Sequence, residues 1–163
     1  MSIDTIPRVQ DRIVVEVDGS EPSKHALLCA QFLAHATGAS IEAVTTWEPF
    51  SGWAAAGTGW SAMPADWNPA GEAEQALATT IQEVFGEHPP PGLTAEVRAG
   101  NPAKVLLDAS DGARMLVVGS RGHGGLDGLL PGSVSAACAE HAICPALVRH
   151  GTTPSPSRTG SPS

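Results

Sequence analysis

Residues 115–133 read MLVVGSRGHGGLDGLLPGS, and this stretch predicts a strand that turns into a helix through a glycine-rich loop. The apolar run 115–118 is typical of a buried strand, and residues 133–142 predict a helix. Glycines let backbone N–H groups approach an anion closely, and the amino end of the helix adds partial positive charge. The stretch therefore predicts a phosphate-binding loop, although such a turn can also serve only to reverse the chain.

Strands and helices alternate on both sides of this stretch. Further strands are predicted at residues 13–17, 41–47, 93–99 and 146–149, and further helices between Ser20 and Gly38 and at residues 73–85 and 102–110. Ser20 is expected to cap the first helix and Gly38 to end it. Such alternation requires a mostly parallel sheet covered by helices on both faces. The predicted fold class is α/β, with a doubly wound parallel sheet.

In doubly wound sheets a ligand binds beyond the carboxyl ends of the strands, where the winding reverses. We expect this reversal between the strand at 13–17 and the strand at 115–118. Asp18 follows the first of these strands and Gly119 follows the second. The two loops are therefore predicted to meet at one crevice.

Composition restricts the classes of protein to consider. With 163 residues, 42% of them apolar, the chain has material for one core. The net charge is −8 and the only lysines are Lys24 and Lys104, so nucleic acid is not an expected partner. No apolar run approaches the ~20 residues that cross a bilayer and no secretory signal precedes the domain, so we expect a cytoplasmic protein without membrane contact.

The domain is predicted to span residues 11–150 and to contain an irregular loop at 48–71. Residues 1–10 are interpreted as an N-terminal extension and residues 151–163 as a disordered tail rich in proline and serine. Cys29, Cys138 and Cys144 lack CxxC spacing and are interpreted as small buried hydrophobic residues. The histidines show no ligand spacing, so no intrinsic metal site is predicted.

The spacing Gly119-x2-Gly122-x9-Gly132-Ser133 resembles the nucleotide motif of the ATP-binding universal stress proteins. Three shorter segments add to the resemblance: VDGS at 17–20, VRAGNP at 97–102 and CPALVR at 144–149. Together they cover roughly residues 11–150. The resemblance implies a five-stranded, Rossmann-like parallel sheet of the adenine nucleotide alpha hydrolase type, with strand order 3-2-1-4-5.

The resemblance also implies a ligand and its contacts. The ligand would be ATP or AMP, and Mg²⁺ could arrive with the nucleotide. The implied nucleotide-binding residues are Val17, Asp18, Ser20, Thr46, Val118, Gly119, Arg121, Gly122, Gly132, Ser133, Val134 and Ser135. Many relatives form homodimers through the last strand, which implies an interface at Ala146–Arg149.

Two positions depart from the family pattern. Glu16 stands where relatives often have glycine, on the same strand face as Asp18, and Pro131 removes one amide donor before Gly132. A buried, unpaired carboxylate costs several kcal/mol. Glu16 is therefore expected to find a hydrogen-bond donor, to be protonated, or to reach water.

Three functions remain open from the sequence. The first is a stress-response module that binds ATP or AMP and signals to an unidentified partner through its occupancy or its dimer state. The second is a slow ATP hydrolase or phosphotransferase with Glu16 or Asp18 as base, although no catalytic pair is visible and only Arg121 could clamp a phosphoryl group. The third is a nucleotide-free interaction protein in which the loop bearing Trp53, Trp60 and Trp67 fills the pocket. That loop is otherwise expected to be a lid, a partner-binding loop or a mobile insertion.

Overall fold

The structure is a computed structural model, and it describes residues 10–48, 66–120 and 132–150. Its strands are β1 (Gln10–Glu16), β2 (Ser40–Trp47), β3 (Leu93–Ala99), β4 (Ala113–Gly119) and β5 (Ala146–Arg149). Its helices are α1 (Glu21–Thr37), α3 (Pro69–Phe85), α4 (Pro102–Ala109) and α5 (Ser133–His141). None of the helices in these ranges is long and apolar enough to cross a membrane.

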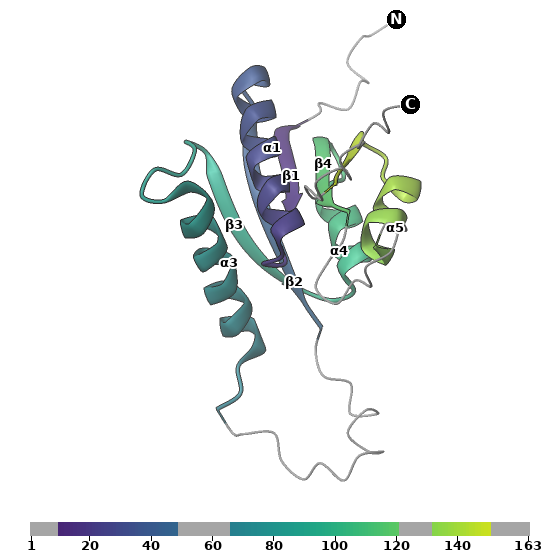
Figure 1. Ribbon diagram of the computed structural model, residues 1–163. Helices are drawn as coiled ribbons and strands as arrows, with labels where there is room; N and C mark the ends of the chain where they lie inside the picture. Colours follow the sequence, from purple (N-terminus) through teal and green to yellow (C-terminus); the bar gives the residue numbers. More distant parts are fainter. Residues whose placement is uncertain (1–9, 49–65, 121–131, 151–163) are drawn as a thin grey trace, which may run out of the picture.

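The five strands form one parallel sheet in the order β3-β2-β1-β4-β5 (Figure 1). The winding reverses at β1, because β2 and β3 lie on one side of it and β4 and β5 on the other. This confirms the predicted doubly wound α/β fold and strand order. The carboxyl ends of β1 and β4 consequently lie side by side.

Each face of the sheet has its own apolar core, because successive strand residues point to opposite faces. Ile13 and Val15 of β1, and Val17 directly after it, pack against α1 and α3. Val14 packs on the other face with Leu106 of α4 and Cys138 of α5. Glu16 alternates with the buried odd residues in the same way as Val14, so its side chain lies on the side of α4 and α5.

The ends of the helices follow from local chemistry. The Ser20 hydroxyl accepts a hydrogen bond from the Ser23 N–H at the start of α1, and Gly38 ends the helix with a φ of 77°. Both predicted caps of α1 are confirmed. A positive φ of this kind favours glycine because a side chain would be strained there.

Helix α3 begins four residues earlier than the apolar pattern from residue 73 predicts. The Asn68 side chain accepts from the Gly71 N–H, and Pro69 occupies the first helical position. Proline is well suited to that position because its missing N–H would have no partner in the first turn. The end of the predicted irregular loop at residue 71 is therefore wrong, while residues 49–65 and 151–163 lie outside the described ranges.

The three cysteines are free thiols that differ in burial. Cys138 is buried between α5 and the sheet, whereas Cys29 and Cys144 are partly exposed. The prediction of buried hydrophobic residues is thus confirmed only for Cys138. Cys144 follows α5 just before the edge strand β5, where fewer elements cover it.

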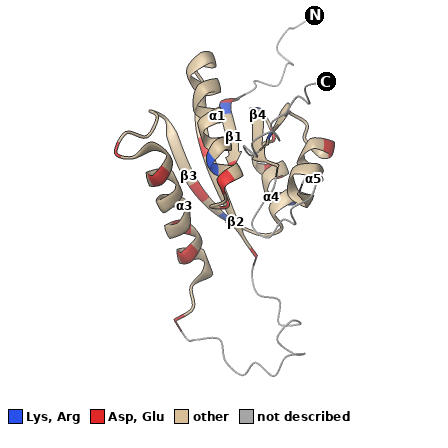
Figure 2. Cartoon of the chain, viewed as in Figure 1, with Lys and Arg blue, Asp and Glu red and all other residues tan. Residues whose placement is uncertain are grey.

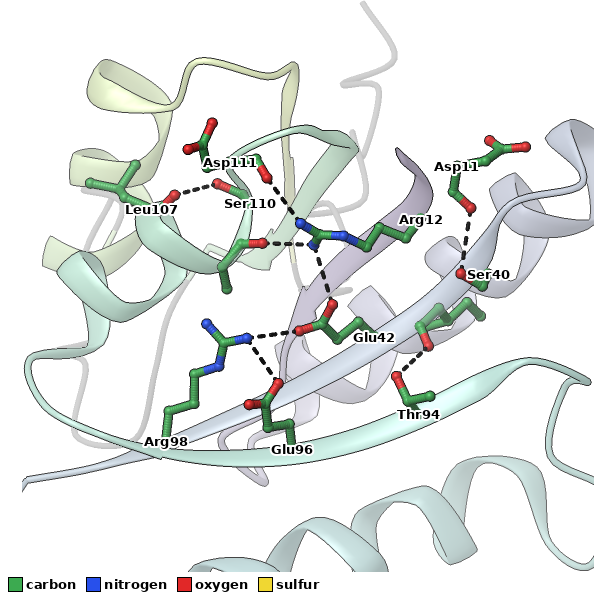
Figure 3. A network of polar contacts seen from close by, with 12 residues as sticks. Asp11, Arg12, Ser40, Glu42, Thr94, Glu96, Arg98, Leu107, Ser110 and Asp111 are labelled. Carbon is green, nitrogen blue, oxygen red and sulfur yellow. Dashed lines mark hydrogen bonds and ion pairs between the residues drawn. The ribbon is translucent and has the colours of Figure 1, made fainter. Parts of the chain in front are cut away.

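An ion-pair network connects β1, β2 and β3 with the end of α4 (Figure 3). The Arg12 guanidinium donates to the Glu42 carboxylate at 3.2 Å and to the carbonyl oxygens of Ala109 and Asp111 at 2.7 and 2.9 Å. Arg98 donates to the other Glu42 oxygen at 3.2 Å. Burial raises the pKa of Glu42 in spite of the two guanidinium groups. Removing either cation would leave a carboxylate that is costly to keep charged.

We predict that Arg12→Ala lowers the free energy of unfolding by about 1–3 kcal/mol, because the Arg12 side chain is only 19% exposed and bonds to charged and main-chain acceptors. Arg114→Ala is the matched control, since its pair with Asp11 is 43% and 53% exposed. That change should cost less than about 1 kcal/mol. Urea unfolding at pH 7 measures both values, and equal losses would contradict the structural importance of the network.

Candidate functional site

The carboxyl end of β1 is tied to β2 by two hydrogen bonds. The Val17 N–H donates to the Val44 carbonyl at 2.9 Å, and Thr45 Oγ1 donates to the Val17 carbonyl at 2.6 Å. The side chains of Val17 and Thr45 are both buried. A ligand could use Val17 only through the second lone pair of its carbonyl oxygen.

A tight turn follows β1 and presents two polar side chains. Asp18 Oδ1 accepts hydrogen bonds from the Ser20 N–H at 2.9 Å and from the Ser20 hydroxyl. Gly19 between them has a φ of +83°, a conformation that a side chain would strain. Asp18 and Ser20 are half-buried. The turn therefore fixes a carboxylate and a hydroxyl next to each other beyond the end of the strand.

Gly119 lies against the first turn of α1. A Cβ at this position would be 2.9 Å from Pro22 Cβ and 3.0 Å from the Pro22 carbonyl carbon, which is closer than packed atoms tolerate. Glycine at residue 119 thus has a packing reason that is independent of any ligand. The same contact brings the turn of Asp18 and Ser20 next to the end of β4.

Ser120, which follows β4, is hydrogen-bonded to the residues at the start of α5. Its carbonyl oxygen accepts from the Gly132 N–H at 2.7 Å and from the Ser135 hydroxyl at 3.2 Å, and its N–H donates to the Arg149 carbonyl at 2.9 Å. The Ser135 hydroxyl also contacts the Gly132 carbonyl at 2.9 Å. Both serines are buried. This arrangement sets where α5 begins relative to β4.

The amino end of α5 differs from those of the other described helices. Ser20, Asn68 and Asn101 each cap a helix with a side-chain oxygen, whereas Gly132 precedes α5 without a side-chain cap. Ser133, the first residue of α5, is exposed. Main-chain N–H groups at an uncapped helix start carry partial positive charge and suit an anion.

Glu16 is half-buried on the side of the sheet covered by α4 and α5. Burial, with a smaller contribution from the negative charge of Asp18, raises the pKa of Glu16 to about 7. Burial and the nearby Glu16 raise the pKa of the Cys138 thiol to about 11, so this carboxyl group lies close to Cys138 of α5. No hydrogen bond or ion pair joins Glu16 to another residue in the described ranges. Of the three outcomes expected for this carboxylate, protonation near neutral pH is the one the structure favours.

The structure brings the predicted site residues together in two groups that meet at the contact between Pro22 and Gly119. One group surrounds the end of β1 and the other joins β4 to α5; they comprise Val17, Asp18, Ser20, Val118, Gly119, Gly132, Ser133, Val134 and Ser135. The Val118 side chain is fully buried, so only its main chain could contact a ligand. Thr46 lies near the end of β2, in register with Arg98 of β3.

Two residues of the predicted site lie outside the described ranges, and two residues that organise the site were not predicted. Arg121 and Gly122 fall outside the described residues. Thr45 and Ser120 organise the two halves of the site, yet no sequence signal marks them. Their hydrogen bonds go to main-chain atoms that only the folded sheet brings near.

Charge is distributed unevenly over the chain. Acidic side chains follow the length of α3, and the few basic ones lie mostly on the strands (Figure 2). A groove of about 470 Å³ between α1 and α3 is lined by Glu72, Glu83 and Lys24, and Lys24 is already paired with Glu83 at 2.8 Å. This groove is unsuited to phosphate. Within the described ranges, no three histidine, cysteine or acidic side chains are grouped to hold a metal ion.

The fold agrees with comparisons to known proteins. Residues 10–150 match the universal stress protein family. The chain belongs to this family. The universal stress protein Rv2623 of Mycobacterium tuberculosis is 32% identical over 139 residues, which cover 85% of this chain and 45% of that protein. The chain thus spans about half the length of the curated relatives it matches.

Solved universal stress proteins share the fold. UspA from Lactobacillus plantarum superposes with a TM-score of 0.66 at 22% identity, over 85% of this chain and 96% of its own. A universal stress protein in complex with cAMP gives 0.56 at 24% identity, over 86% and 97%. The Archaeoglobus fulgidus protein in complex with dAMP gives 0.60 at 19% identity, over 85% and 96%. At these identities the likeness establishes the fold.

For this universal stress protein we compare the free energy of unfolding of Glu16→Gln with that of the wild type. We predict that the difference in favour of the variant is about 1–3 kcal/mol larger at pH 8 than at pH 5. The wild-type carboxyl has its folded pKa raised from 4.5 to about 7, so its contribution to stability is present below pH 4.5 and is lost as pH rises through 7. Denaturant unfolding of both proteins across this range measures the difference. Glu72→Gln, on the exposed side of α3, should leave the wild-type pH profile unchanged. If the unfolding free energies of Glu16→Gln and the wild type changed with pH in the same way, burial would not raise the pKa of Glu16.

Proposed function

We propose that this protein is an adenine-nucleotide-binding module of the stress response. The observation that carries the proposal is the meeting of two groups at one edge of the sheet: the Asp18 and Ser20 turn after β1, and the uncapped start of α5 after β4. Parallel sheets bind ligands at this edge where the winding reverses. A carboxylate and hydroxyl on one side, with main-chain N–H groups on the other, match the polar and anionic ends of a nucleotide.

The family supports this choice of ligand. Two solved universal stress proteins with the same fold are in complex with cAMP and with dAMP. Asp18 would contact the base or the ribose, while Ser133 and Val134 would bind phosphate through main-chain N–H groups and the Ser133 hydroxyl. Gly132 would lie beside the phosphate, with its own N–H bonded to the Ser120 carbonyl. The resemblance of residues 119–133 to the ATP-binding motif extends the proposal to ATP or AMP, with Arg121 and Gly122 also lining the phosphates and Mg²⁺ carried by the nucleotide.

We also propose that the protein signals as a homodimer formed through β5. In the described residues β5 pairs only with β4, which leaves its other edge available. The Pro145 and Arg149 carbonyls bond to β4, so alternation turns the main-chain groups of Val148 outward. An open strand edge of this kind pairs readily with another strand.

We predict that Ser133→Glu weakens ATP binding more than tenfold, because a carboxylate at the start of α5 repels phosphate. A tenfold loss of affinity corresponds to about 1.4 kcal/mol of binding free energy. Ser133 is exposed, so the fold should survive. Ala139→Glu adds the same charge to an exposed position later on α5 and should bind like wild type. Isothermal titration calorimetry with ATP, and mass spectrometry of nucleotide released from the denatured protein, test both variants. Undiminished binding by Ser133→Glu would refute the phosphate site.

We predict that Val148→Pro converts a dimer into a monomer, since proline removes the outward N–H of β5 while an edge strand tolerates it. Light scattering coupled to size exclusion measures the mass of wild type and variant. Circular dichroism verifies that the variant is folded. A wild-type monomer, or a Val148→Pro dimer, would rule out association through β5.

A further inference from the structure

We propose that Glu16 couples nucleotide binding to proton uptake, so that the pocket holds an anionic nucleotide well when Glu16 is protonated and poorly when it is ionised. The inference rests on the proposed function and adds a regulatory property to the same site. It concerns Glu16, the last residue of β1, which lies directly before the turn of Asp18 and Ser20.

The position of Glu16 places its carboxyl between the two groups of the site. Glu16 is the last residue of β1, and Asp18 lies in the turn two residues later, close enough for its negative charge to raise the pKa of Glu16. Glu16 also lies close to Cys138 of α5. Cys138 is one helical turn from Ser135 on the buried side of that helix. The parallel pairing of Val15 with Val117 places Glu16 beside Val118, two residues before Ser120, whose carbonyl oxygen bonds to Gly132 at the start of α5. Glu16 therefore lies at the edge of the sheet where α5 begins.

Glu16 has no cation to compensate its charge among the described residues. Glu42, a partly buried carboxylate on the same face, is held by Arg12 and Arg98 at 3.2 Å each. Glu16 has no such partner in the described ranges, and its strand neighbour in β2 is Val44. A second negative charge next to Asp18 would thus act directly against an incoming phosphate.

The elements packed around Glu16 contribute few other titratable groups. Asp18 lies near it in the turn after β1, and Cys138 lies near it on α5. Helix α4 contributes apolar side chains to this face, namely Leu106 and Ala109, and its Asp108 acts on Arg98 instead. The adjacent strands present Val44, Thr46, Val118 and Ser120. Proton uptake over the neutral range is therefore assigned to Glu16.

The direction of the effect follows from linkage. Glu16 has a pKa of about 7 without ligand, so it is half ionised at that pH. An anionic ligand nearby raises this pKa further, and binding then takes up a proton. Affinity for ATP should fall about tenfold from pH 6.5 to pH 8.5, the change expected for linkage to one proton.

The experiment compares the full-length wild type with Glu16→Gln, which has nearly the same shape and cannot ionise. Calorimetric titrations with ATP from pH 6.5 to 8.5 give the affinity, and titrations in two buffers of different ionisation enthalpy give the protons taken up. Glu16→Gln should bind at pH 8.5 about tenfold more tightly than wild type and take up fewer protons. Because ATP titrates equally in both cases, the difference isolates Glu16. Glu72→Gln should keep the wild-type pH dependence.

The outcomes separate this inference from the proposed function. If both proteins bind ATP with the same pH dependence and the same proton uptake, the coupling to Glu16 is wrong while nucleotide binding stands. If neither protein binds ATP, AMP or cAMP at any pH, the proposed function fails and the coupling fails with it. Loss of binding in Glu16→Gln alone would show that the ionised carboxylate is a ligand contact, which also overturns the coupling.

Discussion

Pro22 lies so close to Gly119 that residue 119 has no room for a side chain, and this contact determines how the carboxyl edge of the sheet is organised. In a doubly wound sheet the chain leaves β1 and β4 toward opposite faces, so the segments that follow them diverge. The first turn of α1 nevertheless packs on the end of β4. That contact holds the start of α1 against the end of β4, and Ser120, the next residue, fixes the start of α5 through Gly132 and Ser135.

The fold was predictable because every level of the sequence agrees on it. Apolar runs give the strands, and local signals such as Ser20 and Gly38 give the ends of α1. The start of α3 was missed because residues 69–72 precede the apolar pattern that begins at residue 73, whereas Pro69 suits a first turn capped by Asn68. A first turn that is held by a capping side chain need not carry apolar residues, so periodicity alone does not reveal it.

The candidate site was predictable only in part, and the reason is physical. Asp18, Gly132 and Ser133 follow strands or begin a helix, so topology alone brings them to one edge. The Thr45 hydroxyl donates to the Val17 carbonyl, and the Ser120 carbonyl accepts from Gly132 and Ser135. These partners come together only once the neighbouring elements have packed. Glycine at 119 was assigned to ligand approach from its spacing, and the structure adds helix packing as a cause that spacing cannot reveal.

Two acidic residues on the same face of the sheet show how position decides the role of a buried charge. Glu42 is compensated by two guanidinium groups that also connect β1 and β3, so it stabilises the fold without a ligand. Glu16 lies nearer the carboxyl edge, without a described cation, beside Asp18 and Cys138. Its burial costs stability whenever it is ionised. A carboxyl group with a raised pKa at the edge where parallel sheets bind ligands marks a candidate functional position, because a change in its charge would alter the affinity for any charged ligand there.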